Sequence, residues 1–204
     1  YVAEYALKDY KITEDEILAK GQEAWDMALN AVNVGKYQLG WSSIGICEHA
    51  FHESINHASN RILYNHAVTE FSHIKQFFVD AYCRLIAMKL VSLRSKDYIR
   101  TASLDDRRYL LYNPIIKMKV TTEGVVVINL LHDIIAAKGY EKDTYFQGAL
   151  TYISANPKLE GTAHVNMALI IKFLPNYFGI GVPHKEYPKV PKIIDGRNDS
   201  FLFN

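Results

Sequence analysis

One long stripe of apolar residues most constrains what this chain can fold into. Between Gly35 and Arg61, apolar side chains recur at steps of three and four, which places them on one face of an α-helix. The stripe consists of Ile44, Cys47, Phe51, Ile55 and Ala58. A helix of this length must bury its apolar face against other helices, so the sequence predicts a helical bundle.

Other segments supply the remaining helices of the predicted bundle. The first helical pattern starts at Gln22, with Trp25, Ala28, Leu29 and Val32 on one face, and Gly35 weakens this helix or permits a bend. A second long helix carries the apolar stripe Phe71, Ile74, Phe78, Ala81, Leu85, Met88 and the turn Val91–Leu93, and frays near Ser95–Asp97. A third starts around Ser103–Asp106 and continues through Val125–Ile135, with Pro114 as a kink or break and Gly139 as its end. Shorter helices are expected over 145–153 and 161–178.

The predicted fold class is all-α. We expect an up-down bundle of three to four long helices, short accessory helices and an extended C-terminal arm. Residues 1–20 form a lead-in, a short strand or extended segment in which Thr13–Glu16 resembles a capping box. Residues 21–178 form the helical domain. Residues 179–204 form the arm, since four of the six prolines lie at or after Pro175.

Composition excludes several classes of partner. The net charge of +1, with mixed signs, gives no footprint for nucleic acid. No apolar run approaches the roughly 20 residues of a membrane span. Cys47 and Cys83 fall on apolar helix faces, so we expect buried free thiols and a reducing, cytoplasmic location. The first residues lack an initiator Met and the features of a signal peptide, so we expect the chain to begin within a longer protein.

Histidines gather at one place in the sequence, which raises the question of a metal site. His49, His52 and His57 lie on one predicted helix, and Glu70 and His73 form a Glu-x-x-His pair. A di-iron bundle needs two such pairs and two further glutamates. Because only one pair occurs, we predict solvated or locally bonded histidines and no metal.

Two charged residues allow either a structural or a functional interpretation. Arg61 follows the first apolar stripe, where it acts either as a solvated cation at a helix end or as a bidentate phosphate ligand. Glu160 precedes the last predicted helix, where a carboxylate interacts favourably with the helix dipole. It is followed by Gly161, whose missing side chain allows a ligand to approach the backbone. The residues alone leave both alternatives open.

Four motifs occur in a fixed order along the chain. They are Val34-Gly35-Lys36-Tyr37, Asn60-Arg61-Ile62-Leu63-Tyr64, Ala136-Ala137-Lys138-Gly139-Tyr140 and Leu159-Glu160-Gly161-Thr162. Together they resemble the Gly-Arg, Arg-x-x-Phe, Gly-Gly-x-Gly-Tyr and Tyr-Glu-Gly-Thr motifs of the acyl-CoA dehydrogenase family. The resemblance spans about residues 5–178 and covers the C-terminal helical domain, with residues 1–20 resembling the end of the middle β-domain. Most of that β-domain and the N-terminal helical domain have no counterpart here.

The resemblance implies a reaction and a base. The reaction is α,β-dehydrogenation of an acyl-CoA thioester in fatty acid metabolism, in which a carboxylate removes the pro-R α-proton and the β-hydride passes to N5 of FAD. Glu160 is the implied base. Other family members carry the base on the first long helix near the Gly-Arg pair, where this chain has Gly35. An α-C–H beside a thioester is a weak acid, so the base should lie in a dry site closed by flavin and substrate.

The resemblance also implies the binding residues. Arg61 and Tyr64 would contact the FAD of a neighbouring subunit, Ala137 and Gly139 would approach the same cofactor, and Thr162 would bond to the flavin. Asn33, Lys36 and Gly161 would lie near the substrate. The implied partners are an electron-transfer flavoprotein or similar acceptor and further copies of the chain, in a homodimer or tetramer.

Departures from the family pattern leave alternatives open. Ala136 and Ala137 replace a glycine pair, and each Cβ disfavours positive φ and close backbone approach. Leu150–Ser154 replaces an arginine- and aspartate-bearing stretch. A related flavin oxidase and a non-catalytic helical assembly module therefore stand beside the dehydrogenase. We expect the 204 residues alone to be inactive.

Overall fold

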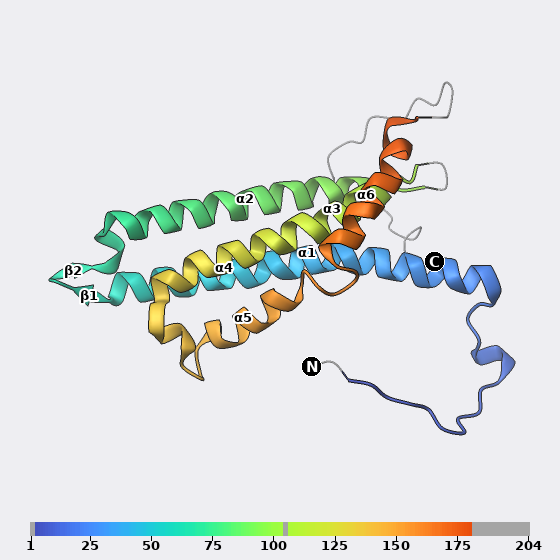
Figure 1. Cartoon of the computed structure of the whole chain (residues 1–204), viewed down its shortest axis with the longest axis horizontal. Helices are drawn as coiled ribbons and strands as arrows, with labels where there is room; N and C mark the ends of the chain where they lie inside the picture. Colours follow the sequence, from blue (N-terminus) through green and yellow to red (C-terminus); the bar gives the residue numbers. More distant parts are fainter. Residues whose placement is uncertain (1–2, 104–105, 181–204) are drawn as a thin grey trace. The chain divides into compact units, whose positions relative to one another are not determined.

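The computed structural model describes residues 3–103 and 106–180, and it is built almost entirely of helices (Figure 1). The elements in chain order are η1 (Glu14–Glu16), α1 (Gly21–Asn60), β1 (Ile62–Leu63), β2 (His66–Ala67), η2 (Val68–Glu70), α2 (Ser72–Arg100), α3 (Tyr109–Ile115), η3 (Ile116–Val120), α4 (Thr121–Ile135), η4 (Ala136–Tyr140), α5 (Tyr145–Ala155) and α6 (Ala163–Phe178). The predicted all-α bundle is confirmed. Residues 181–204 of the predicted arm lie outside the described residues.

The chain divides into two compact units, Tyr1–Val32 and Asn33–Asn204. In the first unit, the predicted capping box is present at η1, where the Thr13 N–H donates to the Glu16 carboxylate over 2.7 Å. Residues 3–12 contain no strand, so of the two alternatives the extended one is observed. Trp25 and Leu29 share a helical face, but their side chains are 61% and 50% exposed.

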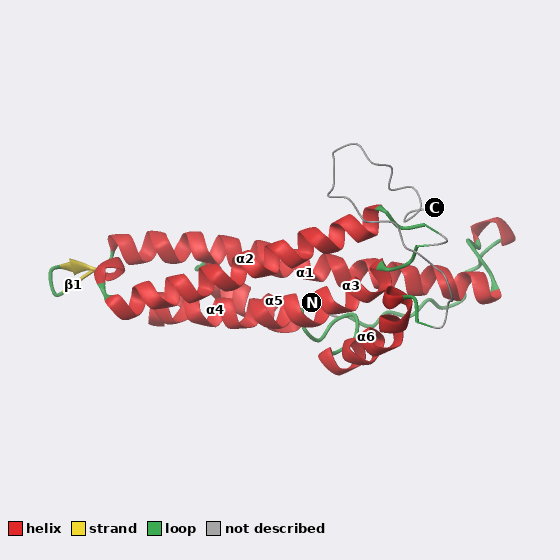
Figure 2. Cartoon of the chain, turned by 90° about the horizontal axis from the view of Figure 1, so that it is seen from above, coloured by secondary structure: helices red, strands yellow, loops and turns green. Residues whose placement is uncertain are grey.

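In the second unit, α1, α2 and α4 run side by side as long helices, and α5 packs along α4 (Figures 1 and 2). The core between them is apolar, and the residues that α4 contributes are nearly all β-branched or leucine. The largest fully buried apolar side chains of this core include Ile44, Ile116, Val120, Val127, Ile128, Leu131, Phe146 and Ile153. The hairpin β1–β2 pairs Ile62 with Ala67 and Leu63 with His66 at one end of the bundle.

The third long helical segment begins later than predicted and passes through Pro114 without a break. It starts at Tyr109, and Pro114 lies in α3 just before a π-helical turn, η3. Proline removes a backbone donor and crowds the preceding turn, and a π-turn is one way in which a helix absorbs such a defect. Ile116 of η3 packs so closely on α1 that a Cβ at Gly40 would lie 2.3 Å from its Cγ2.

Several local predictions need correction. Helix α1 is continuous through Gly35, where the sequence only allows a bend, whereas α2 continues to Arg100 instead of fraying near Ser95. Ile55 was assigned to the buried stripe of α1 but is 43% exposed. Cys83 is exposed and only Cys47 is buried, although both thiols are free. Ile55 lies at the edge of its stripe, where the neighbouring helix decides burial, whereas Cys83 lies two residues from both Ala81 and Leu85 and so faces away from the stripe of α2.

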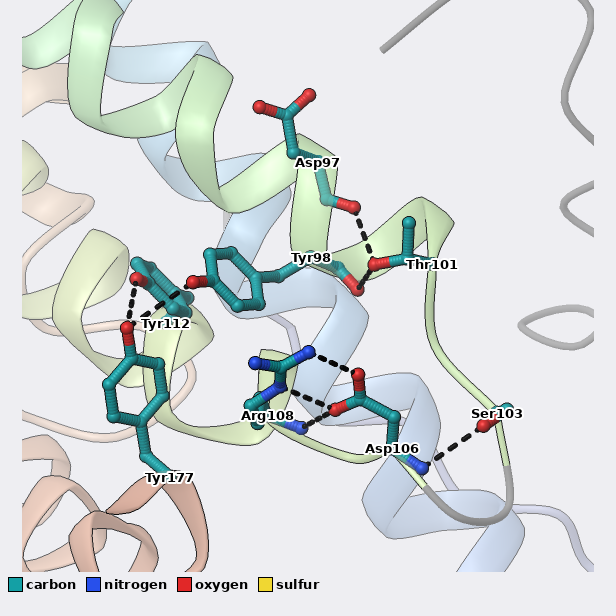
Figure 3. Close-up of polar contacts among 8 residues, drawn as sticks. All are labelled: Asp97, Tyr98, Thr101, Ser103, Asp106, Arg108, Tyr112 and Tyr177. Carbon is teal, nitrogen blue, oxygen red and sulfur yellow. Dashed lines mark hydrogen bonds and ion pairs between the residues drawn. The ribbon is translucent and has the colours of Figure 1, made fainter. Parts of the chain in front are cut away.

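A second, smaller core lies where the end of α2 meets α3 and α6 (Figure 3). The rings of Tyr98 and Tyr112 stack at 4.2 Å, and the Tyr177 hydroxyl lies 3.2 Å and 3.3 Å from their hydroxyls. Arg108 forms a bidentate pair with Asp106, with Nε 2.8 Å from Oδ1 and Nη2 2.6 Å from Oδ2. Through Tyr177, the cluster joins the C-terminal part of α6 to α2 and α3.

The segment Tyr109–Tyr140 is the one helical run in the described residues that is long and apolar enough by composition to cross a membrane. Within the bundle it supplies Ile116, Val120, Val127 and Leu131 to the buried core. The most apolar window of this run is 44% buried within the described structure.

Candidate functional site

Glu160 lies in a strained turn between α5 and α6. Its φ is +52°, and that of the following Gly161 is +90°. A residue with a Cβ pays about 1 kcal/mol or more for a left-handed backbone, so Glu160 must be held in place by its surroundings. Helix α6 begins only at Ala163, and Glu160 is therefore not a first-turn residue of that helix. The dipole interpretation of Glu160 does not describe its position.

The side chain of Glu160 lies against α1 at Gly35. A Cβ at Gly35 would lie 3.2 Å from both Cδ and Oε1 of Glu160. The structure thus places the Glu160 carboxyl beside the position on the first long helix where the resemblance puts the alternative base. Glu160 is exposed among the described residues, so a closed pocket around it requires groups beyond those residues.

Two buried lysines donate to the backbone of this turn. Lys36 Nζ lies 2.8 Å from the Glu160 carbonyl oxygen, and Lys117 Nζ lies 3.1 Å from the Gly161 carbonyl oxygen. Their exposed fractions are 5% and 0%. Burial, and then the neighbouring Lys36 ammonium, lowers the pKa of Lys117 to about 8, while the Glu160 carboxylate opposes this change. Burial also lowers the pKa of Lys36, again against the attraction of Glu160.

The buried Asn113 and Asn166 and the half-buried Asn33 lie at this turn or at the part of α1 that faces it. Asn166 Nδ2 donates to the carbonyl oxygens of Gly161 and Thr162, at 2.9 Å and 3.0 Å. Asn113 Nδ2 donates to the Asn33 carbonyl oxygen at 3.1 Å. Within the described part of the chain, no partner is found for Asn33 Nδ2, Asn113 Oδ1 or Asn166 Oδ1. Of the two α1 residues predicted to bind substrate, Lys36 contacts the Glu160 carbonyl, and Asn33 lies two residues before Gly35 on the same helix.

Lys117, Asn113 and Asn166 were not predicted from the sequence as functional residues. A signal was present for Lys117, because it occurs among apolar residues on a helix that must be buried, where an unpaired lysine is rare. Asn113 and Asn166 carry no comparable signal. Asn113 contacts Asn33, which is 80 residues away in the sequence, so only the fold brings these two together. Asn166 contacts Gly161, five residues away.

Arg61, Tyr64 and Ala137 meet in a second place, a cavity of about 590 Å³ beside the hairpin β1–β2. The cavity is bounded by the end of α1, the start of α2 and the turn after α4. It is lined by His57, Arg61, Leu63, Tyr64, Val68, Phe71, His73, Ile74, Asp133, Ile134, Ile135, Ala136, Ala137, Lys138 and Glu141. After burial, the cations Arg61 and Lys138 lower the pKa of His57, which shows that positive charge gathers at this wall. Lys138 also pairs with Glu141 at 2.7 Å.

The loop after α4 keeps a glycine-like backbone despite its alanines. Ala136 has φ +55° and ψ −140°, a conformation that glycine adopts easily and alanine rarely. Gly139 is buried, and a Cβ there would lie 2.5 Å from Cδ2 and Nε2 of His132. Gly139 therefore allows close packing on the His132 ring.

The Glu-x-x-His pair does not form a metal site with its neighbours. Glu70 contacts His66 at 3.0 Å. No group of three His, Cys, Asp or Glu side chains arranged to hold a metal occurs in residues 3–103 and 106–180.

The two sets of predicted residues lie far apart. Gly35 and Asn60 are separated by 25 residues of one continuous helix, which at 1.5 Å per residue is roughly 38 Å. Thr162 belongs to the Glu160 turn, whereas Arg61, Tyr64 and Ala137 belong to the cavity at the other end of α1. A single extended dinucleotide cannot reach both.

Comparison with known proteins identifies the family. The model for "Acyl-CoA dehydrogenase, C-terminal domain" matches residues 23–174. The chain belongs to the acyl-CoA dehydrogenase family. A search of curated proteins finds no match.

Solved structures share the fold at low sequence identity. An acyl-CoA dehydrogenase from Geobacillus kaustophilus is 12% identical over 82% of this chain and 43% of its own, with a TM-score of 0.72. Butyryl-CoA dehydrogenase from Megasphaera elsdenii is 15% identical over the same shares, with a TM-score of 0.71. Nitroalkane oxidase in complex with spermine is 18% identical over 76% of this chain and 36% of its own, with a TM-score of 0.69. The chain thus spans well under half the length of these relatives, which are flavoproteins of the acyl-CoA dehydrogenase fold.

Proposed function

We propose that this chain is the C-terminal helical part of an FAD-dependent acyl-CoA dehydrogenase, and that Glu160 is its catalytic base. The observation that carries the proposal is the position of the Glu160 carboxyl. It lies against Gly35 of α1, in a strained turn whose two carbonyl groups are held by buried ammonium groups. A carboxylate in a fixed place is what proton abstraction from a weak carbon acid requires.

In this proposal, the chain's own residues perform the proton transfer. The Glu160 carboxylate takes the α-proton of the acyl thioester, the α,β double bond forms, and the β-carbon gives up a hydride. FAD, when bound, supplies the hydride acceptor. Gly35 leaves room for the carboxyl, and Asn33 and Gly161 offer polar backbone and amide groups near the thioester.

The cavity beside β1–β2 has the chemistry to hold the phosphates of an FAD. Arg61 offers a guanidinium fork, which suits phosphate, with Lys138 and His57 beside it. The exposed ring of Tyr64 and the partly buried ring of Phe71 can cover an aromatic group. Because roughly 38 Å of helix separates Gly35 from this end of α1, the cavity would serve the FAD of a neighbouring subunit. This arrangement implies a homodimer or tetramer in which each chain contributes to two FAD sites.

The experiment uses the purified complete protein that contains this chain. Bound flavin should be visible in its absorption spectrum and should bleach when acyl-CoA thioesters of different chain lengths are added without oxygen. Reoxidation by an electron-transfer flavoprotein would complete the dehydrogenase assignment. Absence of flavin and indifference to acyl-CoA would refute it and leave a non-catalytic assembly module.

A related flavin oxidase is the second candidate, favoured by the likeness to nitroalkane oxidase. The same bleached sample separates the two. An oxidase should reoxidise rapidly when air is admitted and form hydrogen peroxide, whereas a dehydrogenase should react slowly with oxygen and rapidly with a protein acceptor.

A further inference from the structure

Lys117 is the most deeply buried charged side chain that the proposed reaction does not use. It has no exposed surface, and its ammonium group makes one hydrogen bond in the described residues, to the Gly161 carbonyl. Burying an ammonium group in this way is unfavourable unless its partners compensate for the lost hydration. A methionine of similar volume would avoid that cost, so the charge must do something that packing alone does not.

The lysine reaches the turn from an unusual helical segment. Lys117 lies in the π-helical turn η3, three residues after Pro114. π-turns are rare and frequently mark functional positions, because the added residue changes the direction of the side chains around the helix. The neighbouring Ile116 is seated in the space that Gly40 leaves on α1, which fixes η3 against that helix.

The two buried lysines donate hydrogen bonds to consecutive carbonyl groups. Lys36 comes from α1 and binds the Glu160 carbonyl, and Lys117 comes from η3 and binds the Gly161 carbonyl. The Asn166 amide adds a second donor to the Gly161 oxygen at 2.9 Å. The backbone that carries the Glu160 side chain is thus held from three helices, and both residues of the turn have positive φ. Strain of this kind persists only where the surroundings over-determine the conformation.

Charge links the lysines to the carboxylate as well. The titratable groups that act on Lys117 are Lys36 and Glu160, with opposite signs. The Glu160 carboxylate favours the charged form of both lysines, against their burial. Displacing the carboxyl from Gly35 would weaken this attraction, so the charges favour the same position as the hydrogen bonds do.

We infer that Lys117, together with Lys36, is a positioning residue that fixes the Glu160–Gly161 turn and so aims the Glu160 carboxyl across Gly35. This inference rests on the proposed role of Glu160 as the base. Lys117 itself is not expected to touch substrate or flavin.

The test compares Lys117→Met with Lys119→Met in the complete, flavin-loaded protein. Lys119 lies in the same π-turn but is exposed and pairs with Glu123, so it is the matched control. Hydrogen exchange at the backbone amides of residues 159–163 reports the turn directly. We expect about tenfold or more faster exchange in Lys117→Met and no change in Lys119→Met.

The kinetic arm measures flavin bleaching by acyl-CoA. A displaced base should lower kcat about 100-fold, with KM changed less than about threefold, because the lysine does not contact the substrate. Lys117→Arg, which keeps the charge and donors, should recover part of the rate. Lys36→Met, which removes the hydrogen bond to the Glu160 carbonyl, should also lower kcat. It replaces Lys117→Met if that variant does not fold.

Two outcomes would overturn the inference: unchanged exchange at 159–163 in a folded Lys117→Met protein, or an unchanged kcat. Failure of the proposed function looks different, because the wild-type flavin would then not bleach. In that case the exchange measurement alone still decides whether Lys117 holds the turn.

Discussion

The part of α1 in the second unit has a different kind of site at each end, near Gly35 and after Asn60. At the Glu160 end, two buried lysines and the buried Asn166 hold a strained turn that carries one carboxyl group. At the Arg61 end, Arg61 and Tyr64 are exposed, and the cavity has room for a ligand but few contacts that fix its side chains. A group that takes a proton must be placed accurately, whereas groups that hold a charged cofactor can be ordered by the cofactor itself. The contrast suggests that chemistry is preorganised at one end and binding is completed by a partner at the other.

Replacing the base tests this contrast most severely. We expect Glu160→Gln to slow flavin bleaching by about 1,000-fold or more while flavin stays bound, because the amide cannot take the α-proton. Stopped-flow absorbance measures the rate, and Glu23→Gln, at an exposed site, is the control. Bleaching at the wild-type rate would mean that the base lies elsewhere.

The buried charge at the Glu160 end should make stability depend on pH. The pKa of Lys117 falls from its ordinary value of 10.5 to about 8 in the folded protein, so between these values the unfolded chain binds more protons. Stability should therefore rise as the pH increases from 8 toward 10, by at most about 2 kcal/mol at pH 9.5. Urea unfolding of wild type and Lys117→Met at pH 7 and 9.5 isolates this contribution. Parallel pH dependence in the two proteins would contradict it.

The Arg61 end should govern cofactor retention. Removing a charged hydrogen-bond donor costs about 1.5–3 kcal/mol, so Arg61→Ala should weaken flavin binding about tenfold or more. The turn around Glu160 should exchange its amides as in wild type. Flavin released on dilution gives the affinity, and Arg107→Ala, an exposed arginine outside the cavity, is the control. Full flavin retention in Arg61→Ala would remove the support for a phosphate role.

Two glycines of α1, Gly35 and Gly45, allow the smallest substitution that tests the site around Glu160. At Gly35 an added methyl group would meet the Glu160 carboxyl at 3.2 Å, whereas at Gly45 nothing lies within 4 Å. We expect Gly35→Ala to slow bleaching by about tenfold through a shift of the base. Gly45→Ala should leave the rate unchanged and stabilise the helix by about 0.5–1 kcal/mol. Equal rates for the two variants would show that the carboxyl does not depend on the space at Gly35.

Much of the fold followed from local pattern. Apolar residues at steps of three and four placed α1, α2 and α4, and Asn156, Pro157 and Gly161 marked the loop before α6. The pattern did not predict that the stripe edge is exposed at Ile55, because burial there depends on the neighbouring helix, and the assignment of Cys83 to an apolar face was wrong because Cys83 faces away from the stripe of α2. Nor did it predict that the helix through Pro114 continues as a π-turn, since that outcome depends on how η3 packs against α1 at Gly40.

The sequence by itself determined the helices, the family motifs and the identity of the candidate base. The tertiary structure decided where that base lies and what holds it. Lys36 and Glu160 are 124 residues apart, and Lys117 and Gly161 are 44 apart. No local periodicity encodes such pairs, because their contact free energy is gained only after the helices pack. For the same reason, the separation of Glu160 from the Arg61 cavity became visible only when α1 proved to be one unbroken helix.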